Sequence, residues 1–472
     1  MPKRRKGLII TLIVVTVVVA ILITFAILFF TTDIFKNGQQ AFLYAISKNM
    51  ETFTTLTNQN ITSQQDFRKA YSYNSTGTIN GTISQGSVTQ NVTLETNARR
   101  DKNTDRYYAD ISLKNAGQDI LKYSYIECND VYAIKCDDIL PNYVGIRNSN
   151  LKEYAKNMGA TEETVKNIPD QVDFEVLKGA FNLSEDESRQ LKSIYMDTVL
   201  NSIPKENFQK AGKENITVSN VSCNANKYTL ILNGEEIKRL LVNLLNTAKT
   251  DEISMNILAK LQNALTSTVD TTIITNNIEN TITKIENDET ISNTTVTINV
   301  YSYKGKTIKT VVDISTLGKI TIDTDKDAQS ITTLIERYDN IGNINMTSQI
   351  TLSKGNYNEN AVYNLEIIPN TLDIGQTINI MIQFGNTTES GYTNSYEVTI
   401  QNGENNFINL QYNVETLASE TVEEIEELTD SNSVIFNNYP IDQLMPFITA
   451  YIQQNSTLIS NRLSTIDSTT VN

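Results

Sequence analysis

Clustered carboxylates are the side chains in this sequence that come nearest to a chemical site. Asp323, Asp325 and Asp327 occupy alternate positions, as the first ligands of a calcium-binding loop do. The loop pattern then fails, because Ala328 stands where the sharp turn needs Gly and Leu334 stands where a bidentate Glu would bind. The three acids also follow directly after a predicted strand. We therefore interpret them as a polar turn exposed to water rather than as a metal site.

A second group of acids lies toward the C-terminus. Thr421 and Glu424 have the spacing of a capping box, and the N-terminal end of a helix dipole favours acidic side chains. The sequence therefore predicts a helix over 419–429 with a solvated acidic face, although such a run also suits a divalent cation or a basic partner. The acids concerned are Glu420, Glu423, Glu424, Glu426, Glu427 and Asp430.

Histidine is absent from the chain. This excludes Ser-His-Asp and Cys-His arrangements, zinc sites built on imidazole, and histidine acid–base catalysis. The sequence also has no phosphate-binding Gly loop, no G-x-S-x-G elbow and no C-x-x-C motif. Paired carboxylates for glycoside hydrolysis have no fixed spacing in a sequence, so that enzyme class stays open. The sequence therefore indicates no catalytic, cofactor-binding or metal-binding residue, and no cofactor.

Three cysteines, Cys128, Cys136 and Cys223, are too few for a disulfide framework. Cys128 and Cys136 flank a predicted hairpin with a two-residue turn, in which Cys128 faces Val131. Side chains alternate along a strand, so the two cysteines point to opposite faces of the sheet. A bond between them would need a bulge, and Cys223 has either one as an alternative partner. Free, buried thiols are the state we expect.

The elements that would position any site begin with an apolar stretch over residues 7–30, which carries no charge. Its 24 residues reach roughly 36 Å as a helix, enough to cross a hydrocarbon layer of about 30 Å. Basic residues precede it, so the positive-inside rule places the tail, residues 1–6, in the cytoplasm and the rest outside the cell membrane. A cleaved signal peptide is the alternative, but its apolar region is usually only about 7–15 residues long. We expect a retained single-pass anchor, with the lipid bilayer as its partner.

The exported part is acidic. The net charge of the chain is −15, and it becomes −19 when the four basic residues of the tail are set aside. Nucleic-acid binding depends on Lys and Arg that neutralise phosphates, so nucleic acid is not an expected partner. The 36 aromatic residues, 22 Tyr and 14 Phe, are enough for real hydrophobic cores.

Periodicity predicts a helix over 38–58, with Phe42 on its apolar face, and then an antiparallel meander. Helical signals dominate from 149 to about 285, where Ser184 and Glu187 form a capping box. A second strand-rich block follows from about 293 to 415, with a turn at Lys304-Gly305, and a helix is expected at 441–463. The strands predicted most clearly are 78–83, 88–94, 106–114, 120–128, 131–136, 227–232, 295–301, 307–314, 319–323, 344–353, 361–368, 377–384 and 394–401.

An apolar stripe over residues 236–265 is the clearest amphipathic pattern in the chain. Such a stripe usually covers one face of a sheet, and it could instead line a channel for a hydrophobic ligand. We expect the former. The residues of the stripe are Ile237, Leu240, Leu241, Leu244, Leu245 and Ala248, continued by Ile253, Ile257, Leu261 and Leu265.

These patterns predict an α+β fold with an N-terminal transmembrane helix, antiparallel β-meanders, a helical middle segment and C-terminal helices. We divide the chain into a cytoplasmic tail (1–6), an anchor (7–30), a first ectodomain segment (31–285) and a second β-rich block with C-terminal helices (286–472). Whether the two strand-rich blocks belong to one continuous sheet or to a divergent duplication stays open.

The order of these segments resembles that of uncharacterised single-span envelope proteins of low-GC Gram-positive bacteria. The helix followed by Ser-Tyr-Asn-Ser-Thr-Gly-Thr-Ile-Asn-Gly-Thr-Ile at 72–83 is similar to the start of LolA/LppX-type lipoprotein-carrier folds, in which a curved antiparallel sheet wraps helices over an apolar cavity. This likeness covers about the first third of the chain and rests on pattern. It implies a lipid-binding role and transfers no site residue.

Three functions are consistent with the sequence. The first is a non-catalytic module outside the membrane that binds or organises an envelope protein, lipid or glycan. The second is a carrier or sensor of a hydrophobic ligand, for which an apolar cavity between helices 236–265 and a sheet is the structural requirement. The third is a carboxylate-dependent glycan hydrolase, which requires two facing acids in an open cleft.

Overall fold

The computed structural model describes residues 39, 42, 59–85, 88–115, 118–136, 138–166, 168–172, 176, 183–218, 221–265, 271–325, 329–339, 341–357, 360–372, 375–402 and 405–467. The predicted anchor at 7–30 lies outside these residues. So does nearly all of the helix predicted over 38–58, of which Gln39 and Phe42 are described and are helical. Among the described helices, none is both long enough and apolar enough to span a bilayer.

Strands dominate the described residues and form one 18-stranded sheet. The first block contributes β1 (Tyr73–Gln85), β2 (Val88–Asp101), β3 (Arg106–Asn115), β4 (Gln118–Cys128), β5 (Val131–Cys136) and β6 (Leu140–Arg147). A hairpin in the helical region contributes β7 (Phe208–Val218) and β8 (Val221–Leu232). The second block contributes β9 (Val296–Tyr303), β10 (Lys306–Ile314), β11 (Gly318–Thr324), β12 (Ser330–Tyr338), β13 (Ile344–Tyr357), β14 (Asn360–Ile368), β15 (Gln376–Phe384), β16 (Gly391–Asn402), β17 (Asn405–Ala418) and β18 (Ser433–Ile435).

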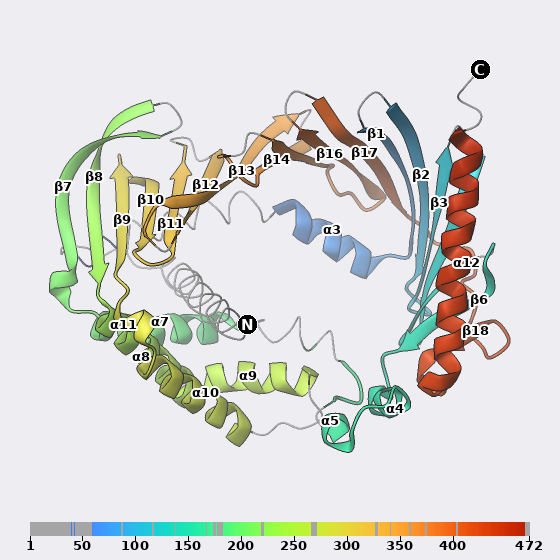
Figure 1. Cartoon of the computed structure of the whole chain (residues 1–472), viewed down its shortest axis with the longest axis horizontal. Helices are drawn as coiled ribbons and strands as arrows, with labels where there is room; N and C mark the ends of the chain where they lie inside the picture. The colour runs from blue at the N-terminus through green and yellow to red at the C-terminus, as the bar shows by residue number, and fades with distance from the viewer. Residues whose placement is uncertain are drawn as a thin grey trace.

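The pairing between β1 and β17 joins the two strand-rich blocks into one continuous sheet. From β7 each strand pairs antiparallel with the next as far as β17, then β17 pairs with β1, and the order runs on to β6. β18 closes this end by pairing parallel with β6. The sheet curves strongly along this order (Figure 1). The predicted α+β class is thus confirmed for the described residues.

Helices line one side of the curve, and α3 lies within it (Figure 1). The α-helices of the described residues are α3 (Gln59–Ala70), α4 (Leu151–Asn157), α5 (Glu162–Lys166), α7 (Glu185–Ser202), α8 (Gly234–Thr250), α9 (Glu252–Leu265), α10 (Thr271–Glu286), α11 (Glu289–Ser292) and α12 (Ile441–Asp467). Short 3-10 turns occur at Lys205–Asn207 and Phe436–Asn438. The predicted capping box is confirmed, since the Ser184 hydroxyl accepts from the Glu187 backbone N–H at the start of α7.

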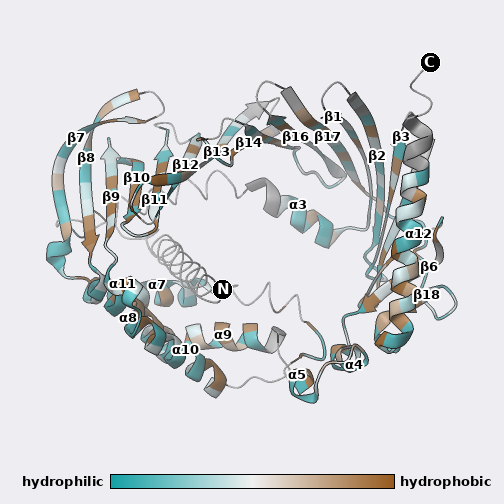
Figure 2. Cartoon of the chain, viewed as in Figure 1, coloured by the Kyte–Doolittle hydropathy of each residue, from teal (hydrophilic) through white to brown (hydrophobic). Residues whose placement is uncertain are grey.

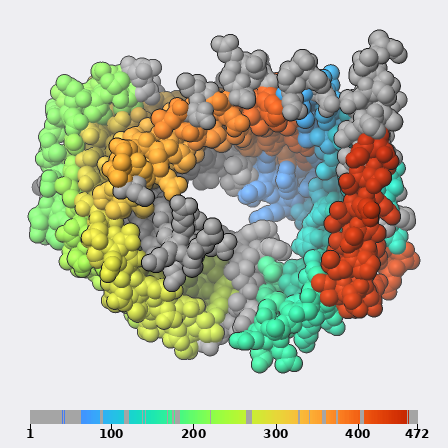
Figure 3. Space-filling view, in the orientation of Figure 1, coloured from blue at the N-terminus to red at the C-terminus, as the bar shows by residue number. Residues whose placement is uncertain are grey.

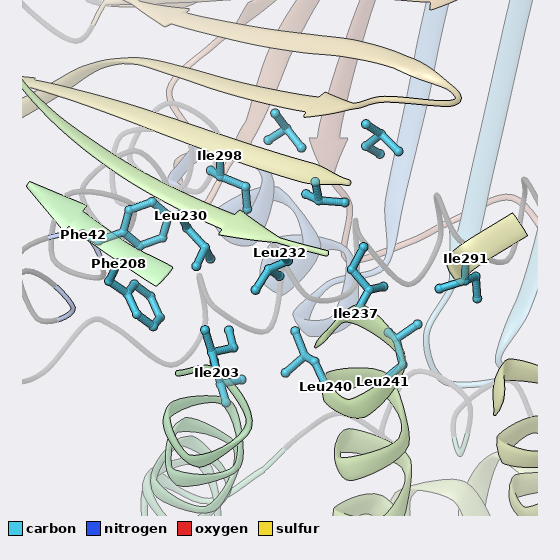
Figure 4. Close-up of a cluster of buried hydrophobic side chains, with 14 of the residues drawn as sticks. Phe42, Ile203, Phe208, Leu230, Leu232, Ile237, Leu240, Leu241, Ile291 and Ile298 are labelled. Atoms are coloured by element: carbon cyan, nitrogen blue, oxygen red, sulfur yellow. The ribbon is translucent and has the colours of Figure 1, made fainter. Parts of the chain in front are cut away.

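The main hydrophobic core lies between α7, α8 and strands β7–β10. Leu240 and Leu241 of α8 point toward the sheet and belong to one buried cluster with Leu230 of β8 and Ile298 of β9 (Figure 4). Leu240 is 2% exposed and Leu230 is 1% exposed, so this cluster is dry. Each such buried side chain contributes about 1.5–3 kcal/mol of transfer free energy. The α8 part of the stripe is therefore core, as expected.

The helix predicted over 419–429 is wrong, because residues 422–429 have no helical structure. This segment instead crosses the sheet face opposite to that of α7, α8 and α3, and it is held at alternate residues. Glu423 pairs with Arg99 at 3.2 Å and Glu427 pairs with Arg106 at 3.5 Å, while Ile425 between them is 3% exposed. The segment is therefore extended, with every second residue facing the sheet. These tertiary contacts override the local signal for a capped helix.

The cysteines lie as the hairpin predicts. Cys128 is opposite Val131 in the register, and no disulfide joins the three cysteines. Cys128 is buried with Ile126, whereas Cys136 is buried with Leu121, so the two sulfurs lie on opposite faces of the sheet. The expected burial is confirmed for these two, while Cys223 is only half-buried.

Candidate ligand-binding face

One face of the sheet is rich in apolar residues along most of its length. We call it the inner face and define it as the face that packs against α7, α8 and α3. Along β15, Ile378, Ile380 and Ile382 point to the inner face, whereas Asn379 and Gln383 point to the outer face. Figure 2 shows this alternation of hydrophobic and hydrophilic residues along the strands.

The same alternation continues in register across the neighbouring strands. Ile380 pairs with Leu365 of β14 on one side and with Val398 of β16 on the other, and Val398 pairs with Leu410 of β17. We call this area the apolar wall. Its half-buried members are Ile350 and Leu352 of β13, Leu365 and Ile367 of β14, Ile378, Ile380, Ile382 and Phe384 of β15, Val398 and Ile400 of β16, Ile408 and Leu410 of β17, Ile79 of β1 and Leu94 of β2.

Burial differs sharply between the two parts of the inner face. Under α7 and α8, Leu230 and Val312 are 1% and 0% exposed. Along the apolar wall the side chains keep part of their surface open, and beyond it Ile83 of β1 and Ile111 of β3 are 39% and 45% exposed. The apolar face therefore extends past the helical layer that covers its other end.

Two glycines let the wall bend at β1. A Cβ at Gly77 would collide with the ring of Tyr412, and a Cβ at Gly81 would collide with the side chain of Leu410. Since both positions point to the inner face, the large side chains of β17 lie across β1. Glycine at such positions is a general device for curving a sheet.

Helix α3 lies against the inner face through few contacts. Gln64 and Asn394 of β16 form a reciprocal amide pair, with N–H···O distances of 2.8 and 2.9 Å, and both are buried. Phe67 packs edge-on against Tyr392 at 5.4 Å between ring centroids. The other α3 side chains from residue 63 to 70 are exposed, although the helix lies inside the curve. Water therefore reaches the interior, and Figure 3 shows an opening beside α3.

Tyrosines collect where the wall ends, near the start of β1 and β16. Tyr73 and Tyr392 are buried beside Phe67, with Tyr107 of β3 packed against them. Burial raises the pKa of Tyr107 to about 12 and that of Tyr125 on β4 to about 12. Both phenols therefore stay protonated at neutral pH and act as hydrogen-bond donors.

The inner face shows no pair of facing acids at these tyrosines. Glu127 lies among them on β4, and its cross-strand neighbours are Tyr107 and Tyr132. A glycan hydrolase needs a second carboxylate across the cleft. At this position the described residues do not provide one.

The calcium-like run is part of the sheet and its turn. Asp323 lies in β11 with its carboxylate 3.2 Å from Lys309, and burial raises the pKa of Asp323. Asp325 accepts hydrogen bonds from the backbone N–H of Gln329 and the hydroxyl of Ser330. Asp327 lies outside the described residues. Within them, no three acids or cysteines gather as a metal site would require.

The residues that hold α3 could not be predicted from the sequence. Gln64 and Asn394 are 330 positions apart, and a polar residue facing inward from a strand carries no local signal of its partner. Each strand of the apolar wall except β17 was among those predicted from the sequence. Part of the inner face is covered by no described helix. This could not be predicted, because the alternation of residue types along a strand does not show where the helices pack.

Comparisons with other proteins give a family and no function. A family model described as a family of unknown function (DUF6583) matches residues 1–439. No curated protein and no solved structure gives a significant match.

Proposed function

We propose that this chain, which belongs to the DUF6583 family of unknown function, binds an apolar or amphiphilic ligand along the apolar wall outside the cell membrane, where residues 7–30 anchor it. The proposal joins two of the functions consistent with the sequence, a non-catalytic envelope module and a carrier of a hydrophobic ligand. It includes no catalytic step.

The observation that carries the proposal is the half-buried apolar wall. Apolar surface exposed to water is costly, and burying it returns about 25 cal/mol for each Å². An acyl chain that covered the wall would gain about 0.8 kcal/mol for each buried methylene, against the entropy lost on binding. Because the opposite face of β15 is mainly polar, with Met381 as its apolar member, such a ligand has one favourable face to contact.

The proposed site differs from the one that the amphipathic stripe suggested. Leu240 and Leu241 pack directly on β8 and β9, so the space between α8 and the sheet is filled. The wall lies farther along the same face, on β13–β17, β1 and β2. The sequence pattern at 72–83 that is similar to LolA/LppX-type carriers implies a lipid-binding role, and we propose that this chain shares it by binding an acyl chain along the wall.

Paired substitutions on adjacent residues test the proposal. The full-length chain is purified in a fluorinated surfactant, which mixes poorly with acyl chains, and titrated with an environment-sensitive fluorescent fatty acid. We expect Ile380→Asp to weaken binding at least tenfold, because it places a charge on the wall. Asn379→Asp adds the same charge on the outer face of the same strand and should bind as the wild type does.

A second variant guards against a folding defect. Ile380→Trp keeps the wall apolar and fills the space that the ligand would occupy, so it should also weaken binding while the far-UV circular dichroism stays unchanged. Equal affinity in the wild type, Ile380→Asp and Ile380→Trp would exclude the wall as the binding site.

A further inference from the structure

Hydrogen-bond donors without a partner among the described residues gather at the end of the apolar wall, where β1 and β16 begin. The wall residues Ile79 and Val398 lie six positions farther along these strands than Tyr73 and Tyr392. At a rise of about 3.3 Å for each residue, six positions correspond to roughly 20 Å. A ligand lying along the wall would therefore have one end at this cluster.

Arg68 of α3 is the charged member of the cluster. Its Nε donates to the Tyr392 hydroxyl at 2.6 Å, and its guanidinium carbon lies 5.9 Å from the centroid of the Tyr392 ring. These contacts fix the plane of the guanidinium group. Its two terminal amino groups have no partner among the described residues, and the side chain is exposed within the curve of the sheet.

Two tyrosines add donors beside it. Tyr73 is 7% exposed, and its hydroxyl has no hydrogen-bond partner among the residues that the structure describes. The same holds for the hydroxyl of Tyr107, which is half-buried. Both tyrosines pack in one cluster with Tyr392, the hydrogen-bond partner of Arg68, so the three groups lie near one another. The charge of Arg68 lowers the pKa of both phenols against the larger, raising effect of burial. Each hydroxyl therefore has an O–H donor available to an acceptor on a ligand.

The other charges nearby are already engaged. Arg100 donates from one terminal nitrogen to the Arg68 carbonyl oxygen at 3.1 Å and from the other to Asp105 at 2.7 Å. Lys102 donates to the Ala70 carbonyl oxygen at 2.8 Å. These two cations cap the C-terminal end of α3. Glu127 has an interaction of its own and lies among the tyrosines. Among the described residues of this cluster, Arg68 is therefore the cation whose terminal N–H groups are available to a ligand.

We infer that the ligand of the apolar wall is an anionic amphiphile, whose carboxylate or phosphate head accepts hydrogen bonds from Arg68, Tyr73 and Tyr107. This inference rests on the proposed function, since it assigns the head group of the same ligand. A guanidinium group offers paired N–H donors that match two oxygens of such a head, and protonated phenols add neutral donors.

Matched sixteen-carbon ligands test the inference on the full-length chain in fluorinated surfactant. Palmitate and hexadecyl phosphate carry the anionic head, hexadecanol has the same chain without charge, and inorganic phosphate has no chain. We expect both anions to bind at least tenfold more tightly than hexadecanol in the wild type. Arg68→Gln should remove this advantage and leave hexadecanol binding unchanged, while Arg68→Lys should retain part of it.

Arg189→Gln is the control, because Arg189 lies on α7 and is 72% exposed. It should bind every ligand as the wild type does. Equal affinity for hexadecanol and palmitate in the wild type would overturn the inference and leave the proposed function standing. Inorganic phosphate that bound as tightly as hexadecyl phosphate would overturn the inference too, because the acyl chain would then add nothing. Failure of all three sixteen-carbon ligands to bind would overturn the proposed function itself.

Discussion

Single residues show which signals in a sequence are local. The turn at Lys304-Gly305 was predicted from two residues, and both have positive φ, 50° and 79°. The opposite orientations of Cys128 and Cys136 followed from strand alternation alone. The amide pair of Gln64 and Asn394 could not be predicted, because each member looks like an ordinary polar residue until the fold brings them together.

The buried tyrosines predict a specific alkaline transition. The pKa of Tyr107 is raised from 10 to about 12, so above pH 10 the unfolded chain loses a proton that the folded chain keeps. Stability linked to this group is complete below pH 10 and is lost as the pH rises toward 12. In Tyr107→Phe, denaturant midpoints should fall less between pH 8 and pH 11 than in the wild type. An equal fall in both proteins would show that Tyr107 titrates normally.

Elements were predicted best where one face is apolar. Strands such as β14 and β15 alternate cleanly and were found, whereas β7, which is exposed along most of its length, was missed. The segment 419–429 was predicted as a helix because its acids fit a helix N-terminus. Its true partners, Arg99 and Arg106, lie more than 300 positions away, and a hydrogen bond from Arg106 to the Ile425 carbonyl oxygen holds the segment further.

Leu→Ala substitutions in two elements should show, by their different effects on stability, which part of the inner face is covered. Leu240→Ala in α8 removes a side chain that is 2% exposed and should cost about 2–5 kcal/mol of the free energy of unfolding. Leu365→Ala on β14 removes a half-buried wall residue and should cost only about 1 kcal/mol. Denaturant midpoints of the full-length chain measure both. Equal losses would mean that the wall is covered, which would count against a binding role.

At the scale of the whole molecule, the α+β class could be predicted from the sequence. Whether the two strand-rich blocks form one continuous sheet could not. The β1–β17 pairing joins segments more than 300 positions apart, such as Tyr73 and Ala418, and no local pattern encodes such a register. That pairing makes one long curved face from two blocks. The placement of α7 and α8 at one end of that face is what leaves the wall half-buried, so the candidate site is a property of the assembled fold.

Photo-cross-linking in cells tests the binding of an acyl chain to the wall most directly. Cells that express the full-length chain are fed a photoactivatable long-chain fatty acid, irradiated, and the labelled peptides are mapped by mass spectrometry. Label on residues 7–30 would mark contact of the predicted anchor with the bilayer. We expect additional label on β13–β17 and β1, reduced in Ile380→Asp and unchanged in Asn379→Asp. Label confined to residues 7–30, with none on these strands, would contradict the proposal.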